Sequence, residues 1–339
     1  MNLIHTDFEI INQEPGLKGV YKAAEYPGRI CYGSTDKITE DSAQPFVENT
    51  LMASNHGAPL EHAAVYLKCP QSVYMKYVNN KYSRTSYHKT ESKEGPITWM
   101  DADRTVGYLS DVCTYYVSTN LRVLYDNDWL DDLKYLCEPT QYHTKRITVK
   151  FTCDIGVSRE YNRHRNDSPN EESTRYCNYS KDKFGKAINI IEPCWFYDKH
   201  DELITKIEKT NFRTYINWIH AGQDDLFSDI DYWLFANLSC EWSYMNLTEK
   251  CGWKPQQARS ILPLDTKTIL IHTAFVDDWV HFFNLRAIGT TGAPHPQAKE
   301  LAEPLMNEFI KRDYLNHELK SRLGKKQRDY NKKDNNIKI

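Results

Sequence analysis

Charged and hydrogen-bonding side chains are concentrated in one stretch near the middle of the chain, residues 156–183, GVSREYNRHRNDSPNEESTRYCNYSKDK. Residues 158–173 hold almost no large apolar side chain. Arginine offers five donors in a fixed fork that matches the oxygens of phosphate or carboxylate groups. Arg163 and Arg165 flank His164, so adjacent side chains can diverge towards two anionic groups. The stretch is therefore either a solvated loop with internal ion pairs or a polar site for an anionic ligand.

The order of residues within this stretch favours the site. Arg163-His164-Arg165 is followed, after seven residues, by Ser173, with Asn170-Glu171 and Arg175-Tyr176 at fixed places around it. This pattern resembles the RHR..S.NE.S.RY signature of the flavin-dependent thymidylate synthases, and the chain matches every fixed position. A signature spaced in this way is far more specific than a single glycine-rich loop.

The resemblance implies a reaction. Deoxyuridylate (dUMP) is methylated at C5 to give dTMP, with 5,10-methylenetetrahydrofolate as the carbon donor and NADPH as the reductant of FAD. It also implies a homotetramer whose active sites combine residues from several subunits. A related flavin enzyme that transfers a different one-carbon unit to a pyrimidine nucleotide remains an alternative.

The resemblance also assigns roles to individual residues. Arg286 is the expected catalytic residue, because its guanidinium reaches the pyrimidine and favours ionisation at N3, where negative charge develops. The expected substrate-binding residues are Glu160, Tyr161, Asn162, Arg163, Glu171, Glu172, Ser173, Thr174, Arg175 and Arg259. The expected cofactor-binding residues are His56, Arg163, His164, Arg165, Asn170, Glu171 and His281.

Further blocks of the resemblance occur in order along the chain, from about residue 29 to residue 305. They are an R..Y.S element at 29–34, a histidine-rich element at 56–62, an AR..LP helix at 258–263, an HFL.LR helix at 281–286 and a closing element at 295–298. Glu160 stands where many members have Gln, and Ala58 replaces a hydroxyl residue near the flavin. Phe275 and Asp277 stand where some members carry Asn and Arg that touch the cofactor.

Neither a metal site nor a cysteine nucleophile is expected. His56 and His62 lie six residues apart with a proline between them, whereas ligands on one helix face favour a spacing of four. The nine cysteines are odd in number and include no C-x-x-C pair, which indicates reduced thiols. Cys177 is expected to pack in the core, and Ser173 to contact a ligand rather than to attack a substrate.

The net charge of −3 gives no general attraction to nucleic acid. A nucleic-acid-binding module that uses Arg163, Arg165 and the basic tail is the other class considered, but the neighbouring glutamates would repel a phosphate backbone. The N-terminal residues show no signal-peptide pattern, and no run approaches the roughly 18 apolar residues of a membrane span. We expect a cytoplasmic protein without membrane or specific nucleic-acid partners.

Several segments must position these residues. Apolar periodicity predicts strands at 63–68, 147–153, 188–193 and 266–273, and helices at 17–24, 39–53, 129–136, 206–221, 230–250, 256–262, 276–287 and 297–310. With the resemblance, they imply an α+β fold in which long helices flank a curved, mostly antiparallel sheet. We expect one domain over residues 1–310 with an insertion at 69–147, at an edge of the fold or in the substrate cleft. The basic tail 311–339 is expected to be helical at first and then disordered.

Overall fold

Two compact units make up the chain in the computed structural model, which describes residues 1–90, 97–100, 106–109 and 112–325. Unit 1 comprises Met1–Ile11, Arg29–Lys37 and Thr148–Ile339, and unit 2 comprises Asn12–Gly28 and Ile38–Ile147. Helices and strands are mixed in the chain, which confirms the predicted α+β class. The segment 69–147 lies in unit 2 together with residues 12–28 and 38–68. The interpretation of residues 1–310 as one domain stays a prediction.

The main sheet of unit 1 has four strands in the order β2-β8-β11-β9. β2 (Asp7–Ile11) pairs antiparallel with β8 (Arg146–Asp154), and β9 (Ser168–Glu171) pairs antiparallel with β11 (Lys267–Phe275). The strands predicted at 147–153 and 266–273 are thus confirmed, as their β-branched and aromatic content suggested. A separate parallel pair joins β1 (Asn2–Ile4) to β10 (Asn189–Ile191), inside the predicted strand 188–193.

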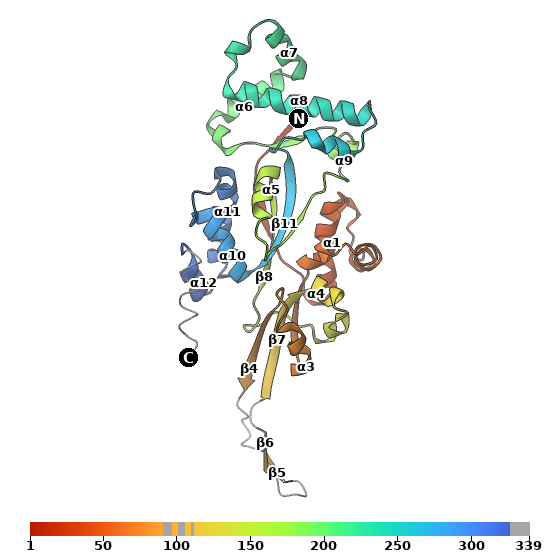
Figure 1. Ribbon diagram of the computed structural model, residues 1–339, viewed down its shortest axis with the longest axis vertical. Coiled ribbons are helices and arrows are strands. Elements are labelled where there is room, and N and C mark those ends of the chain that lie inside the picture. The colour runs from red at the N-terminus through yellow and green to blue at the C-terminus, as the bar shows by residue number, and fades with distance from the viewer. Residues whose placement is uncertain (91–96, 101–105, 110–111, 326–339) are drawn as a thin grey trace. The chain divides into compact units, whose positions relative to one another are not determined.

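Aromatic rings fill the space between this sheet and the C-terminal helices. Trp279, Phe282 and Phe283 of α10 (Val276–Phe283) are fully buried, and Phe151 of β8 stacks on Phe282 with ring centroids 6.2 Å apart. α10 packs on β11, while α11 (Pro296–Lys311) packs on β2 and α5 (Ile155–Tyr161). Figure 1 shows α10 and α11 grouped with α12 (His317–Arg322). Each buried ring stabilises the fold by about 1.5–3 kcal/mol.

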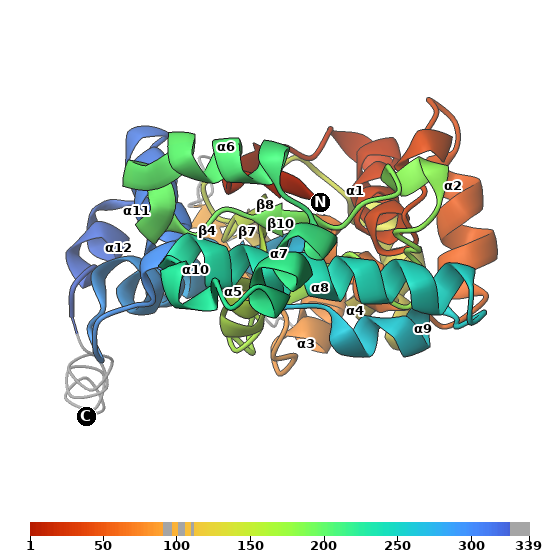
Figure 2. The ribbon, with the colours of Figure 1, turned by 90° about the horizontal axis from the view of Figure 1, so that it is seen from above.

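A second apolar cluster of unit 1 lies among α6 (His200–Lys209), α7 (Phe212–His220) and α8 (Asp229–Glu249). Figure 2 shows these three helices from above. α9 (Pro255–Ala258) contacts α8. The helix predicted at 230–250 is confirmed. The single helix predicted at 206–221 is wrong, because the chain divides it into α6 and α7. Asn211 causes the division, since its side chain accepts a hydrogen bond from the Thr214 amide at 3.2 Å and starts a new helix.

Unit 2 contains a three-stranded antiparallel sheet in the order β3-β7-β4. Its strands are β3 (Ala64–Cys69), which confirms the strand predicted at 63–68, β7 (Val112–Asn120) and β4 (Arg84–Thr90). β5 (Ile97–Met100) pairs antiparallel with β6 (Val106–Leu109). The helices of this part of the chain are α1 (Gly16–Cys31), α2 (Ala43–Phe46), α3 (Gln71–Tyr77) and α4 (Leu121–Asp126).

Two predicted helices differ in detail from the structure. Over 39–53 the regular helix is only α2, followed by a π-helical turn at Val47–Met52. The start is late because the Ser42 hydroxyl accepts a hydrogen bond from the Thr39 amide at 2.8 Å and closes a turn there. The helix predicted at 129–136 is a 3₁₀ helix over Leu130–Tyr135. In the tail, α12 provides the expected helical start, and residues 326–339, predicted to be disordered, lie outside the described residues.

Candidate active site

The signature stretch folds into a short helix, a turn and a strand. α5 follows β8 directly, and the Asp154 carboxylate caps it by accepting a hydrogen bond from the Val157 amide at 2.7 Å. The chain then turns and enters β9, where Asn170 lies opposite Ile271 of β11. The sequence predicted neither α5 nor β9, because the polar composition of the stretch hides the pattern of a buried face.

A buried hydrogen bond fixes the turn between α5 and β9. His272 of β11 lies 2.7 Å from Asp167, measured from Nε2 to Oδ2, and both side chains are almost completely buried. A carboxylate oxygen accepts, so Nε2 of His272 donates. Sequence reasoning missed both residues, because the contact follows from the β9–β11 register, and spacing along the chain does not reveal it.

Arg286, the predicted catalytic residue, lies on a π-helical turn, Asn284–Ile288, and is held by three contacts. Nη1 donates to Oε2 of Glu160 and Nη2 donates to the Glu160 carbonyl oxygen, each at 2.7 Å. Nε donates to Nε2 of His164 at 3.2 Å. A guanidinium has five N–H donors, so two remain for a ligand. The contacts hold the plane of the guanidinium in one orientation.

His164 is buried beneath Arg286 and is neutral. Its burial, with smaller contributions from His272, Arg286 and His281, lowers the pKa of His164 from 6.5 to about 2. A neutral imidazole that accepts at Nε2 carries its proton on Nδ1. Its ring packs against Phe282 and His281, with centroids 5.0 and 5.6 Å away. In this arrangement the buried His164 ring accepts a hydrogen bond from Arg286 and helps to hold its guanidinium in place.

The outer arginines of the signature differ from its central histidine. Arg163 and Arg165 are exposed, and among the described residues neither side chain forms an ion pair or a hydrogen bond. Two exposed guanidinium groups with all their donors available fit the pyrophosphate of FAD or the phosphate of dUMP. The residues present are therefore compatible with the cofactor that the resemblance implies.

Glu171 and Glu172 contact different groups: Glu171 forms hydrogen bonds with residues of α5 and its C-cap, and Glu172 forms an ion pair with β11. Burial raises the pKa of Glu171, which accepts hydrogen bonds from the Ser158 hydroxyl at 2.8 Å and the Asn162 amide at 3.4 Å. Glu172 forms an ion pair with Lys267 of β11 at 2.9 Å, and both side chains are largely buried. The two glutamates thus tie β9 to α5 and to β11.

The Ser173–Arg175 segment lies beside Arg259. Nη1 of Arg259 is 3.4 Å from the Thr174 hydroxyl, and the Arg175 amide donates to the Ser173 hydroxyl at 3.3 Å. The Arg175 guanidinium lies 5.7 Å from the centre of the Tyr176 ring and is exposed. Four predicted substrate-binding residues, Ser173, Thr174, Arg175 and Arg259, are therefore brought together.

Two of the predicted site residues are Tyr161, whose side chain is buried, and His56, which belongs to the other unit. The Tyr161 side chain is fully buried, and its hydroxyl donates to the Ala298 carbonyl at 2.7 Å, so a contact with substrate would have to come from its main chain. His56 belongs to unit 2, whereas the signature belongs to unit 1. Burial lowers the pKa of His56. Ala58 also lies in unit 2, at the start of the 3₁₀ helix Ala58–His62.

His281 lines a small pocket of about 80 Å³ with Asp277, Asn284, Thr290 and Arg322 among its walls. Burial lowers the pKa of His281, while Asp167 opposes this shift and Arg286 adds to it. Phe275, the last residue of β11, is buried.

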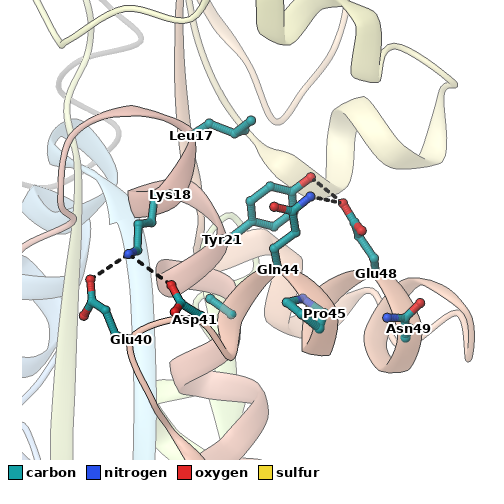
Figure 3. Close-up of a pocket in the computed structure, with 10 residues that line it drawn as sticks. Leu17, Lys18, Tyr21, Glu40, Asp41, Gln44, Pro45, Glu48 and Asn49 are labelled. Carbon is teal, nitrogen blue, oxygen red and sulfur yellow. Dashed lines mark hydrogen bonds and ion pairs between the residues drawn. The ribbon is translucent and has the colours of Figure 1, made fainter.

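A larger cavity of about 490 Å³ lies within unit 2, and none of the predicted site residues lines it (Figure 3). Three acids and one lysine line it: Glu40, Asp41, Glu48 and Lys18. Lys18 pairs with Glu40 at 2.6 Å, and Tyr21 donates to Glu48 at 3.0 Å. The excess of acids makes this cavity a poor site for an anionic nucleotide.

Cys177 lies in an apolar cluster with Tyr179, Ile188 and Tyr244 and is fully buried. Burial, together with the charge of Glu172, raises the pKa of the thiol to about 12. The thiolate form is therefore negligible near neutral pH, in agreement with the packing role expected for this residue.

The chain belongs to the thymidylate synthase complementing protein family, whose model matches residues 97–313. The match confirms the family resemblance seen in the signature. The blocks at 29–34 and 56–62 lie outside the matched residues.

Among solved structures, the UMP/dUMP methylase PolB from Streptomyces cacaoi is 16% identical and covers 96% of this chain and 98% of its own, with a TM-score of 0.39. Thymidylate synthase X from Helicobacter pylori, solved with FAD and dUMP, is 12% identical over 92% of this chain and 100% of its own, with a TM-score of 0.35. No curated protein matches. Among the described residues, no helix is long and apolar enough to cross a membrane.

Proposed function

We propose that this chain is a flavin-dependent thymidylate synthase that converts dUMP to dTMP with 5,10-methylenetetrahydrofolate and NADPH. The observation that carries the proposal is the arrangement of the signature. Arg163 and Arg165 keep all their donors available, while His164 between them is buried and supports Arg286. A solvated loop would not need a buried neutral histidine at its centre.

The substrate phosphate is assigned to the arginines near Ser173. A phosphate dianion requires several fixed cations and donors; Arg175 follows Thr174 in the chain, and Nη1 of Arg259 lies 3.4 Å from the Thr174 hydroxyl. Arg163 adds a third charge from the turn after α5. We assign Asn162, Glu171 and Glu172 to the walls of the same site.

Arg286 is assigned to the uracil ring. Methylation at C5 requires electron density to move into the ring, which places negative charge on the N3–C=O edge. The two donors of Arg286 that Glu160 and His164 leave available can stabilise this charge. Because the guanidinium is already fixed, little reorganisation is needed as the reaction proceeds.

FAD would be held by Arg163, Arg165, Asn170 and Glu171, with His281 and His56 as further contacts. When bound, FAD supplies the hydride that reduces the transferred carbon to a methyl group. The role of the protein is to neutralise the pyrophosphate and to orient the nucleotide. We further propose a cytoplasmic homotetramer with shared active sites, in which His56 of unit 2 takes part.

The decisive experiment is a product assay. Purified protein is incubated with dUMP, NADPH and methylenetetrahydrofolate, and the nucleotide product is identified by mass spectrometry. We expect dTMP, and a protein with a flavin absorbance spectrum that NADPH bleaches under anaerobic conditions. A protein that binds no added FAD would contradict the proposal, and a product carrying a different one-carbon unit would indicate the related enzyme instead. Replacing dUMP by UMP in the same assay measures how the sugar is recognised.

A further inference from the structure

Two histidines and a buried glutamate from distant parts of the chain meet in unit 1. His5 follows β1, Glu192 follows β10, and His200 is the first residue of α6. The parallel pairing of β1 with β10 places Ile4 opposite Ile191, and the Glu192 amide donates to the Ile4 carbonyl at 2.9 Å. The backbone therefore brings His5 and Glu192 together, and the 3₁₀ helix Cys194–Lys199 returns the chain to them.

The side chains converge on one point. Nδ1 of His5 lies 3.3 Å from Oε2 of Glu192, and Nδ1 of His200 lies 3.0 Å from each of its carboxylate oxygens. One ligand atom from each of the three residues lies within 4.8 Å of the others. In a tetrahedral zinc site with bonds of about 2.1 Å, neighbouring ligand atoms are about 3.4 Å apart. Small side-chain rotations would bring the three atoms to that separation.

The charge of Glu192 needs a counter-charge. The Glu192 side chain is fully buried, and a buried carboxylate is costly unless it is paired. Among the described residues, no lysine or arginine nitrogen lies within 4 Å of it, and the side-chain nitrogens that do lie within 4 Å belong to the two histidines. A neutral imidazole offers a carboxylate only a hydrogen bond, whereas a divalent cation neutralises it and takes both imidazole nitrogens as ligands.

We propose that His5, Glu192 and His200 form a binding site for a divalent transition-metal ion, with Zn²⁺ as the first candidate. Two imidazole nitrogens and one carboxylate oxygen are a common protein ligand set for zinc, completed by water. His5 and His200 are 65% and 38% exposed, so the fourth position opens to solvent. Binding releases to solvent any proton held on the coordinating nitrogens.

Neighbouring groups support this geometry. The Tyr197 ring lies edge-on to His5, with centroids 6.1 Å apart, and its hydroxyl donates to Glu300. The same carboxylate accepts a hydrogen bond from the Thr6 hydroxyl at 2.8 Å. These contacts restrain the residue after His5 and the ring beside it. The metal would tie the N-terminal strand to the start of α6, so the inference does not depend on the proposed enzymatic function.

The test uses the full chain after treatment with a chelator. Zn²⁺ is added in competition with a fluorescent zinc chelator, and bound metal is counted by elemental analysis. Co²⁺ is used as a second probe, because a tetrahedral site with nitrogen and oxygen ligands gives intense visible absorption. His5→Gln and His200→Gln each remove one ligand at a partly exposed position, and His220→Gln removes an exposed histidine of α7 as a matched control.

We expect one Zn²⁺ per chain in the unchanged protein and in His220→Gln, with affinity at least tenfold weaker in His5→Gln and His200→Gln. Thermal unfolding checks that all variants are folded. Tighter binding of another divalent transition metal through the same residues would support the site and change the ion. If the unchanged protein binds neither Zn²⁺ nor Co²⁺, or if His5→Gln and His200→Gln bind as tightly as the control, the proposal is wrong. The latter result would place the metal on other residues, such as cysteines.

Discussion

Arg286 lies between Glu160 and His164 with three of its five donors engaged, and this limits what substitution can preserve. Arg286→Ala and Arg286→Lys should both lower kcat and kcat/KM together, by roughly a hundredfold or more, because the interaction forms mostly in the transition state. Lysine keeps the charge but loses the planar fork that reaches three acceptors. Stopped-flow measurement of the two half-reactions should show flavin reduction by NADPH largely unchanged.

Two comparisons sharpen this prediction. Arg259→Ala should mainly weaken dUMP binding, with a loss of about 1.5–3 kcal/mol for a charge-assisted hydrogen bond. Arg312→Lys should change neither kcat nor dUMP binding. Arg312 follows α11 and forms an exposed ion pair with Glu308 of its last turn. Normal dTMP formation by Arg286→Ala, or loss of FAD from it, would show that the assigned role is wrong.

The buried state of His164 predicts a pH dependence of stability. Its folded-state pKa is about 2, so the unfolded state binds the proton more readily below pH 6.5. The stabilising contribution is therefore fully present above about pH 6.5 and is lost as the pH falls. We expect a loss of roughly 1 kcal/mol in the free energy of unfolding between pH 6.5 and 5.5. Urea titrations at several pH values measure it.

His164→Gln provides the comparison, because its amide oxygen can still accept from Arg286 but does not titrate. Burial lowers the pKa of His143 and of His281 as well, so the variant should retain part of the acid sensitivity. The pH slope of its stability should be smaller than that of the unchanged protein. Identical slopes would mean that His164 is not neutral in the folded state.

Cys177 allows a test of the chemical route. Its thiol is buried and its pKa is raised to about 12, so the thiolate of Cys177 is not available near neutral pH. Cys177→Ala should retain turnover and lose about 1 kcal/mol of stability through the small cavity it creates. Inactivity in a folded, flavin-loaded Cys177→Ala protein would instead indicate covalent catalysis.

At the scale of elements, the turn after Arg286 depends on glycine. Gly289 ends the π-helical turn with φ at +80°, and a Cβ there would lie 2.6 Å from the Gly292 carbonyl oxygen. Gly289→Ala should therefore cost both the left-handed conformation, about 1–2 kcal/mol, and the clash. Gly222→Ala is the matched control, because its φ is +66° and no atom lies within 4 Å of the new Cβ.

Chemical denaturation should show Gly289→Ala to be the less stable variant, and its kcat should fall because Arg286 shifts. Equal stability losses in the two alanine variants would mean that the loop beyond Gly289 yields without strain. In that case the turn would not fix the position of Arg286.

A comparison of the predicted and observed elements shows which parts of the fold can be predicted from the sequence. Strands β8 and β11 and helix α8 were predicted, because their patterns extend over nine residues or more. α5 and β9 were missed, since elements of seven and four residues are too short to carry a clear periodic signal. For the site, the spaced signature pointed to Arg163 and the HFL.LR block at 281–286 pointed to Arg286, and both roles stay predictions.

Contacts between distant segments could not be predicted. The Asp167–His272 hydrogen bond and the cluster of His5, Glu192 and His200 both depend on strand register, which joins residues more than one hundred positions apart. No spacing rule along one segment applies to them. The only sequence motif that suggested metal ligands, His56 with His62, lies in a different part of the chain from the proposed metal site.

At the scale of the whole molecule, α8 presents aromatic side chains that its own unit does not cover. Tyr232 is 58% and Trp242 is 48% exposed, although Ile230, Leu234 and Tyr244 of the same helix are buried. A helix that is apolar around most of its circumference is usually buried on more than one side. Contiguous exposed apolar surface commonly marks a contact between subunits. The exposed Tyr232 and Trp242 rings favour α8 as a surface for subunit packing.

We expect light scattering to show a tetramer, and Trp242→Glu to shift it towards smaller species by placing a charge in the contact. Trp242→Phe should preserve assembly, because the ring that stacks on Phe212 at 5.0 Å is replaced by another aromatic ring. If subunits share their active sites, specific activity should fall on dilution in step with dissociation, and more steeply for Trp242→Glu. A monomer with full activity at every concentration would contradict the shared-site arrangement, since one chain would then hold all the residues that the reaction needs.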